Sequence, residues 1–500
     1  MKKIIAFLLI VAMCFIMVAC NDNPTPDPDP NPNPNPNPDP TPDPAPEKVT
    51  YEVPAVGYDG SEVTITFSHT MGENLRNELD AAIERFNVLF PNITVEHSQI
   101  GGYPEVRDQI KQELTAGNQP NLAYCYPDHV ALYNLTKKVV ALDNFIESTI
   151  TVTHDDGTTE VLGLTAEQID AYIDGYYKEG TVFDAAGTMY TLPMSKSTEV
   201  LYSNKTFFDK HNLTVPTTWD EMEATCAQIQ QILKNDADPT NDQDKILGYD
   251  SESNWFITLC EQYNSNYTSA TGSNFLFNNK TNRDFVKKLR GWYEKGYVTT
   301  QELEGAYTSG LFVAEDIYMC IGSSAGAQHQ VPNDIDGVAP FEVSITKIPQ
   351  LDPEDPAAIS QGPSLCIFKK ADPQEVLASW LFVKFITTDP EFQASFSMVS
   401  GYIPVIERDI LVEAVPYYGE WLAGTAENLS KKDIAIATSI AVGLDQADAY
   451  FVSPAFNGSS KARDQVGALL QYCFTTAADD VDAMILEAFK KAIAECIADA

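Results

Sequence analysis

The chain has 500 residues, of which 44% are hydrophobic and 21% charged, and its formal net charge is −39. These proportions are those of a folded globular protein, and the length exceeds what one hydrophobic core usually covers, so two or more domains are expected. The strong negative charge argues against nucleic acid or an anionic membrane surface as a partner, because both would repel the chain.

The N-terminus has the pattern of a secretion signal. Lys2 and Lys3 precede an apolar run from Ile4 to Val18, which small Ala19 and then Cys20 follow. Such a run is short for a membrane span and suits the core of a signal peptide. The segment MVAC that ends at Cys20 resembles a lipobox, so we expect residues 1–19 to be removed and Cys20 to carry lipid. The alternative is an ordinary secretion signal with an incidental cysteine.

Residues 20–47 form a proline-rich segment. Every second residue from Pro24 to Pro46 is proline, alternating with Asn, Asp, Thr and Ala. Such a run cannot pack a core and favours an extended polyproline conformation. We interpret it as a tether that holds the folded part at the extracytoplasmic face of the membrane, with the lipid on Cys20 as its membrane contact. A proline-rich recognition motif is less favoured, because the aliphatic and basic flanks of such ligands are missing.

No cofactor or metal is predicted. The six histidines are dispersed, and the cysteines after Cys20 are scattered singly, mostly inside apolar runs, without metal-ligand spacing. No phosphate-loop, dinucleotide or kinase motif occurs in the sequence. We therefore expect buried thiols and a function without a resident cofactor.

The region after the tether alternates strand and helix patterns. Residues 62–68, 93–95 and 120–126 have strand patterns, and residues 74–90 and 105–116 have helical apolar spacing. This order predicts parallel strands with crossover helices, so a doubly wound sheet. Ligands of such sheets bind at the carboxyl ends of the strands, where this sequence places His69, Tyr103, and Tyr126 with Asp128.

The rest of the chain predicts a second α/β region and a mostly helical end. Helices are expected near residues 219–234, 255–263 and 281–295, and a hairpin within residues 151–163. Residues 313–321 are expected to form a strand that returns to the first sheet, and residues 362–368 the last strand, followed by a helix over residues 374–387. Trp255 is open to two interpretations: a core residue, or an aromatic face in a binding cleft.

The pentapeptide from Gly322 to Gly326, GSSAG, formally matches the nucleophile elbow of hydrolases. That interpretation requires an acid and then a histidine much later in the chain. The later histidine is His329, which is too close in sequence to come from elsewhere in the fold. We therefore favour a glycine-serine turn whose Ser323 or Ser324 donates hydrogen bonds to a ligand.

Three blocks carry a resemblance to a known family: residues 101–124 (GGYPEVRDQIKQELTAGNQPNLAY), 192–208 (LPMSKSTEVLYSNKTFF) and 401–404 (GYIP). They resemble the family 1 solute-binding proteins of ABC importers, in particular the maltose-binding and glycerol-3-phosphate-binding group. The resemblance extends from about Val63 onward. It implies an α/β, class II periplasmic-binding-protein-like fold of two lobes, each a doubly wound sheet flanked by helices. We expect lobe 1 in residues 48–193 and 313–362, and lobe 2 in residues 194–312 and 363–500.

The resemblance also implies a ligand site and partners. The residues of the implied ligand site are Tyr103, Tyr126 or Asp128, Ser197, Ser323 or Ser324, Gly362 and Tyr402. Trp255 is a further candidate. Relatives that bind glycerol 3-phosphate use an arginine near the C-terminal loop; here that loop contains Ser459 and Arg463 follows it. Because this departs from the family pattern, both a mono- or oligosaccharide and a glycerol phosphoester remain open as ligands.

The implied partner is the transmembrane permease of an ABC importer, with the protein acting as a monomer and not as an enzyme. Two other classes remain open. A secreted carbohydrate-active hydrolase would need two carboxylates facing the cleft. A surface carbohydrate-binding adhesin would use the tether as a stalk but would not require lobes that close.

Overall fold

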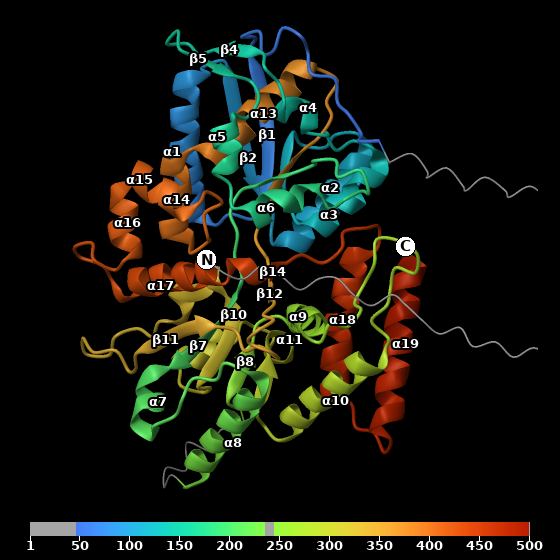
Figure 1. Cartoon of the computed structure of the whole chain (residues 1–500), viewed down its shortest axis with the longest axis vertical. Coiled ribbons are helices and arrows are strands. Elements are labelled where there is room, and N and C mark those ends of the chain that lie inside the picture. Colours follow the sequence, from blue (N-terminus) through green and yellow to red (C-terminus); the bar gives the residue numbers. More distant parts are fainter. Residues whose placement is uncertain (1–46, 236–244, 500) are drawn as a thin grey trace, which may run out of the picture. The chain divides into compact units, whose positions relative to one another are not determined.

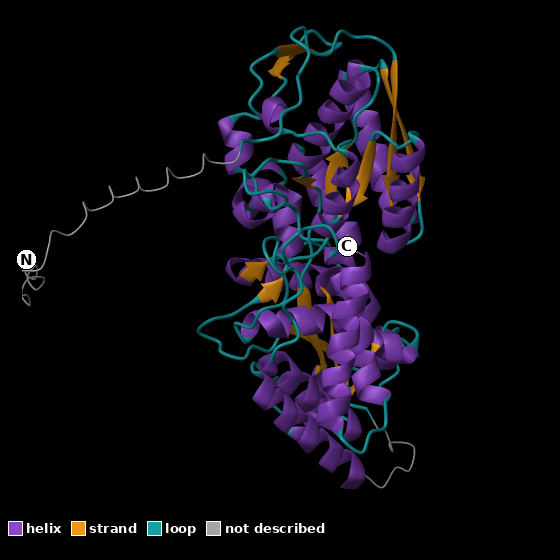
Figure 2. Cartoon of the chain, turned by 90° about the vertical axis from the view of Figure 1, so that its right-hand side faces the viewer, coloured by secondary structure: helices purple, strands orange, loops and turns teal. Residues whose placement is uncertain are grey.

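The computed structural model describes residues 47–235 and 245–499. The predicted signal peptide, Cys20 and nearly all of the predicted tether lie outside these ranges. Within them the chain forms two five-stranded sheets, each covered by helices (Figures 1 and 2). No helix in the described ranges combines the length and apolar character needed to cross a bilayer.

The first sheet has the order β2-β1-β3-β13-β6. Its strands are β1 (Val63–His69), β2 (Ile93–Gln99), β3 (Leu122–Cys125), β6 (Leu192–Pro193) and β13 (Ser364–Ile367). β1 pairs in parallel with β2 and β3, as the alternating strand and helix patterns predict. β13 is antiparallel to both β3 and β6, so it closes this sheet with a segment from late in the sequence.

Helices cover both faces of the first sheet. Their bounds are α1 (Glu73–Leu89), α2 (Tyr103–Ala116), α3 (Pro127–Tyr133), α4 (Asp143–Ile146), α5 (Ala166–Asp170), α6 (Asp174–Lys178), α13 (Pro373–Thr388) and α14 (Pro390–Ser400). In α1 the buried residues Leu79, Ala82, Ile83 and Phe86 recur at helical spacing, and they pack in one core with α13. α2 and α3 bury their apolar residues in a separate core with β3 and β13. The predicted hairpin is confirmed as β4 (Thr151–Thr153) and β5 (Thr159–Val161).

The second sheet has the order β11-β7-β10-β8-β9. Its strands are β7 (Glu199–Asn204), β8 (Leu247–Tyr249), β9 (Val298–Thr300), β10 (Met319–Ser323) and β11 (Val343–Lys347). Side chains alternate across it: Leu201 points into a core with Trp255 and Ile321, whereas its neighbours Val200 and Tyr202 point into the opposite core.

The helices of the second lobe include the C-terminal part of the chain. Their bounds are α7 (Lys205–His211), α8 (Trp219–Asn235), α9 (Glu252–Gln262), α10 (Lys280–Glu294), α11 (Gln301–Glu304), α12 (Ser309–Val313), α15 (Arg408–Ala414), α16 (Pro416–Leu422), α17 (Lys431–Asp445), α18 (Ser459–Thr475) and α19 (Val481–Asp499). α8, α9, α10, α18 and α19 share one core on one face of the sheet. α15, α16 and α17 cover the other face.

The sequence assigned three strands to the wrong lobe. β10 and β11, expected in lobe 1, both pair with β7 of the second sheet, and the strand expected over residues 313–321 begins only at Met319, because Val313 still belongs to helix α12. Conversely, β13 and α13, expected in lobe 2, belong to the first sheet and its core. The reason is that a buried strand shows its apolar pattern in sequence, but only hydrogen-bond pairing decides which sheet receives it.

Two extended segments cross between the sheets and pair with each other. Ser197 and Gln361 exchange backbone hydrogen bonds of 2.9 and 2.8 Å, one residue from each crossing. The preceding Lys196 exchanges bonds of 2.9 and 2.6 Å with Ile403, which follows α14. A short parallel pair, β12 (Ala358–Ile359) with β14 (Tyr450–Phe451), lies beside them and leads into α18. The crossings are thus tied to one another at the point where the lobes meet.

A buried ion pair lies at these crossings. The side chain of Lys196 is fully buried and that of Glu179 is 3% exposed, and Lys196 Nζ lies 2.5 Å from Glu179 Oε1. The same ammonium group donates to Ser364 Oγ at 3.0 Å and to the Gly362 carbonyl at 3.3 Å. Its three donors therefore join the first crossing to the second and to the first lobe.

Candidate functional site

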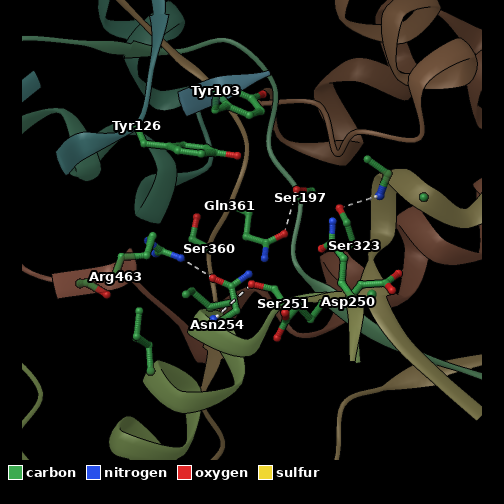
Figure 3. Close-up of a pocket in the computed structure, with 18 of the residues that line it drawn as sticks. Tyr103, Tyr126, Ser197, Asp250, Ser251, Asn254, Ser323, Ser360, Gln361 and Arg463 are labelled. Atoms are coloured by element: carbon green, nitrogen blue, oxygen red, sulfur yellow. Dashed lines mark hydrogen bonds between the residues drawn. The ribbon is translucent and has the colours of Figure 1, made fainter. Parts of the chain in front are cut away.

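A cavity of about 590 Å³ lies where the two lobes meet the crossings. That volume is within the range of small-molecule sites in proteins. Figure 3 shows its arrangement: Tyr103 and Tyr126 lie on one side, Asp250, Ser251 and Asn254 on the other, and Ser197 and Gln361 of the crossings between them.

Three tyrosines form the first-lobe wall. Tyr103 begins α2 and Tyr126 follows β3, so both stand at the carboxyl ends of the parallel strands. Their rings stack with centroids 4.3 Å apart at 24°. The Tyr103 hydroxyl lies 3.4 Å from that of Tyr402, which follows Gly401, the left-handed cap of α14. This wall offers aromatic faces and phenol groups to a ligand.

The opposite wall is a hydrogen-bonded chain of polar side chains. Arg463 donates to Asn254 Oδ1, which leaves the Asn254 amide nitrogen to hydrogen-bond Glu199. Tyr249 donates to Glu199 Oε2 at 2.5 Å. The Ser251 hydroxyl caps α9 by accepting from the Asn254 backbone N–H, which fixes the start of that helix at the cavity.

Three carboxyl groups line the cavity: Asp128, Glu199 and Asp250. Burial raises the pKa of Glu199 from its usual 4.5 to about 7, although the bonds from Tyr249 and Asn254 oppose the change. Burial also raises the pKa of Asp250, against two hydrogen bonds of 2.7 Å from Thr308. For Asp128 burial is again the largest effect, but nearby His129 and Arg463 outweigh it and the pKa is lowered.

Several polar atoms at the cavity have no hydrogen-bond partner among the described residues. They are Tyr267 Oη, Gln330 Oε1, Ser360 Oγ and Ser453 Oγ, and all four residues line the cavity. A buried hydroxyl without a partner costs free energy, so such groups are normally satisfied by water or a ligand. The cavity is therefore equipped to form further hydrogen bonds with an occupant.

Comparison with known proteins identifies the family. The family model described as "Bacterial extracellular solute-binding protein" matches residues 81–409, which is more than half of the chain. The chain belongs to the bacterial extracellular solute-binding protein family. The resemblance found in the sequence is thereby confirmed.

Individual relatives agree with this assignment. The sn-glycerol-3-phosphate-binding periplasmic protein UgpB of Salmonella typhimurium is 24% identical over 352 residues, covering 68% of this chain and 74% of the relative. UgpB from Mycobacterium tuberculosis, solved with glycerophosphocholine, has a TM-score of 0.66 at 17% identity over 87% of this chain and 98% of its own. The cyclic alpha-maltosyl-1,6-maltose binding protein from Arthrobacter globiformis has a TM-score of 0.63 at 17% identity, and the match covers 88% of this chain and 100% of that protein's chain. These structures confirm the predicted two-lobe α/β fold.

Most of the site residues expected from the sequence meet at the cavity of this solute-binding protein. Those that line it are Tyr103, Tyr126, Asp128, Ser197, Ser323, Tyr402, Ser459 and Arg463. They come from both lobes and from the first crossing, and their chain positions span most of the described sequence. Their convergence makes the cavity the candidate ligand site.

Three expected site residues lie elsewhere. Trp255 is fully buried in the second-lobe core, where its ring stacks on Tyr249 with centroids 4.6 Å apart, so its interpretation as a cleft residue is wrong. Ser324 is also fully buried, and its Oγ accepts from the Thr198 backbone N–H at 3.3 Å. Gly362 has φ +92°, and a Cβ there would lie 2.6 Å from the Ser195 carbonyl, so its role is to let the two crossings approach closely.

Other lining residues were missed, chiefly Glu199, Asp250, Asn254 and Tyr267. Asp250 follows β8 and Asn254 lies in the first turn of α9, so the rule that ligands bind at carboxyl strand ends, applied to the second sheet, would have found them. Glu199 and Tyr267 carry no such local signal. An acidic residue in a chain this acidic becomes notable only when the fold buries it.

Proposed function

We propose that this solute-binding protein captures a carbohydrate in the cavity between its lobes and delivers it to the permease of an ABC importer, without chemical turnover. The observation that carries the proposal is that one cavity takes its walls from both lobes and its floor from the paired crossings. Binding at such a place favours the closed arrangement of the lobes, which a permease can distinguish from the open one.

The cavity walls suit a sugar ring. Stacked Tyr103 and Tyr126 offer flat apolar faces to the C–H surface of a pyranose. Asn254, Gln361 and the unpartnered hydroxyl of Tyr267 offer donors and acceptors to its hydroxyl groups. Relatives described as binding cyclic maltosyl-maltose and maltotriose share this fold.

A glycerol phosphoester is the second candidate. Arg463 and the start of α18 at Ser459 both reach the cavity, and a helix N-terminus with an arginine is a favourable place for a phosphate. We rank it second, because the guanidinium already donates to Asn254 and because three carboxyl groups surround the same cavity. A phosphate placed there would meet more negative than positive charge.

We also propose that the protein is held at the extracytoplasmic face of the membrane through lipid on Cys20, as a monomer. The support is the sequence alone: the signal-peptide pattern that ends in MVAC and the proline-rich segment that follows it. Metabolic labelling with a palmitate analogue tests this, and a Cys20→Ala variant that is still labelled would contradict it.

A thermal-shift screen of the purified protein tests the ligand proposal. The panel contains mono- and oligosaccharides, glycerol 3-phosphate and glycerophosphodiesters. A ligand at a hundredfold excess over its dissociation constant stabilises the native state by about 2.7 kcal/mol. We expect a shift with a carbohydrate that Tyr402→Ala abolishes and Tyr417→Ala, an exposed tyrosine on α16, leaves unchanged.

Other outcomes of the screen would favour a phosphoester ligand or a hydrolase. A shift with phosphoesters alone, lost in Arg463→Ala, would make the second candidate primary. Absence of any shift, together with steady release of reducing sugar from a polysaccharide, would refute capture and favour a hydrolase.

A further inference from the structure

The charges around the cavity are unbalanced. Three carboxyl groups line it, Asp128, Glu199 and Asp250, whereas the basic residues among the described lining residues are Arg463 and His329. The charges of His129 and Arg463 act on Asp128 and lower its pKa, whereas burial raises the pKa of Glu199 and of Asp250. Buried carboxylates are normally paired, so this site has capacity for positive charge from outside the chain.

Glu199 and Asp250 stand at the same edge of the second sheet. Glu199 begins β7 and pairs with Ser323 at the end of β10, while Asp250 follows β8, which runs parallel to β10. Asp250 Oδ2 lies close beside the end of β10, because a Cβ on Gly322 would approach it to 2.8 Å. The fold therefore gathers two acidic side chains where one sheet edge faces the cavity.

The groups that donate hydrogen bonds to Glu199 carry no charge. Tyr249 and Asn254 donate to it, and both are neutral. Arg463 donates to the Asn254 oxygen, which fixes the orientation of that amide, and its positive charge also acts on Glu199 and lowers its pKa without offsetting the effect of burial. Glu199 itself is 1% exposed, so water screens it little.

An independent observation indicates that a ligand completes this site. Tyr267 is 8% exposed and lines the cavity, yet its hydroxyl has no hydrogen-bond partner among the described residues. On the other side, the stacked pair of Tyr103 and Tyr126 lines the cavity, and a tyrosine face that the stacking leaves free attracts cations. Both walls therefore favour a ligand that combines polar groups with positive charge.

We propose that the ligand is an amino sugar with a free ammonium group, and that this group lies against Glu199 and Asp250 at the edge of the second sheet. The proposal rests on the carbohydrate function proposed above and adds the charge of the ligand. An ammonium group carries N–H donors that carboxylate oxygens accept, whereas a quaternary ammonium group has none. The amine therefore fits the acidic edge better than a choline headgroup does.

Isothermal titration of the purified full-length protein with a matched set of disaccharides tests this. Chitobiose, N,N′-diacetylchitobiose and cellobiose share the β-1,4-linked glucose frame and differ in charge and substituent. We expect chitobiose to bind tighter than either neutral sugar by on the order of thirtyfold, which is the effect of a buried hydrogen-bonded charge pair. Glu199→Gln should abolish most of that preference, while Glu354→Gln, an exposed carboxyl outside the cavity, should keep it.

A second measurement uses the unaltered protein. At about pH 6, where the sugar amine is protonated, binding should release a proton from the acidic edge, so the heat of binding should differ between buffers of different ionisation enthalpy. Asp250→Asn provides a second variant if Glu199→Gln does not fold.

The outcomes separate this inference from the function beneath it. Equal affinity for the charged and neutral sugars would overturn the ammonium site and leave carbohydrate capture standing. Binding of glycerophosphocholine in preference to every sugar would overturn it in favour of a quaternary cation. If no sugar bound at all, the carbohydrate function itself would fall.

Discussion

The buried ion pair between Lys196 and Glu179 gives the sharpest test of how the crossings are held. Lys196→Met removes the ammonium group but keeps most of the side-chain volume. The variant leaves the Glu179 carboxyl, 3% exposed, without a cation, and it removes a donor from Ser364 Oγ and from the Gly362 carbonyl. Breaking a buried pair on one side costs about 3–5 kcal/mol of unfolding free energy.

The chain offers a matched control eighteen residues earlier. Lys178 pairs with Asp174 on the surface, where the two side chains are 70% and 74% exposed. Exposed pairs of this spacing contribute about 0.3–0.5 kcal/mol, so Lys178→Met should be almost silent. Urea unfolding followed by tryptophan fluorescence measures both variants, with Trp380 reporting on the first lobe and Trp219, Trp255, Trp292 and Trp421 together reporting on the second.

A double variant identifies the cause of the loss. In Lys196→Met with Glu179→Met the unpaired charge is gone, so much of the lost stability should return. The reasoning is refuted if the single variant loses less than about 1 kcal/mol. It is also refuted if the double variant is less stable than the single one, because the pair would then act through something other than charge.

Three further outcomes follow from single sites. Between pH 4.5 and about 7 the native protein keeps a proton on Glu199 that the unfolded chain has released, so stability should fall by about 3 kcal/mol as pH rises through that window, and Glu199→Gln should remove this dependence in urea titrations. Gly362→Ala should lower the free energy of unfolding by more than about 1 kcal/mol, because the φ of Gly362 is +92° and backbone atoms fill the space of a Cβ. Gly326→Ala is the control, because the space around Gly326 is open. Equal melting temperatures of the two variants would contradict this. Trp255→Ala should lose about 3–5 kcal/mol as a core residue, and a loss of ligand affinity at unchanged stability would instead support a cleft role.

The candidate site was predictable wherever a local motif carried it. The GYIP turn placed Tyr402 at the cavity, and the parallel strand order placed Tyr103 and Tyr126 beside it. The interpretation of Trp255 as a cleft residue was wrong because helix α9 is buried around most of its surface. The sequence of such a helix does not show which side faces a cleft. Glu199 was not predicted as a site residue because its raised pKa comes from burial in the fold and not from its neighbours in sequence.

The sequence by itself determined the two-lobe family, the type and approximate bounds of the main helices and strands, and the chemistry of the tyrosine wall. These depend on periodicity, turn residues and short motifs, all of which are local. The tertiary structure alone decided that β10 and β11 join the second sheet and β13 the first, and that Glu199 and Asp250 face one cavity. The physical reason is that strand pairing and the burial of charge are relations between residues far apart in sequence, which acquire a free energy only when the chain brings them together.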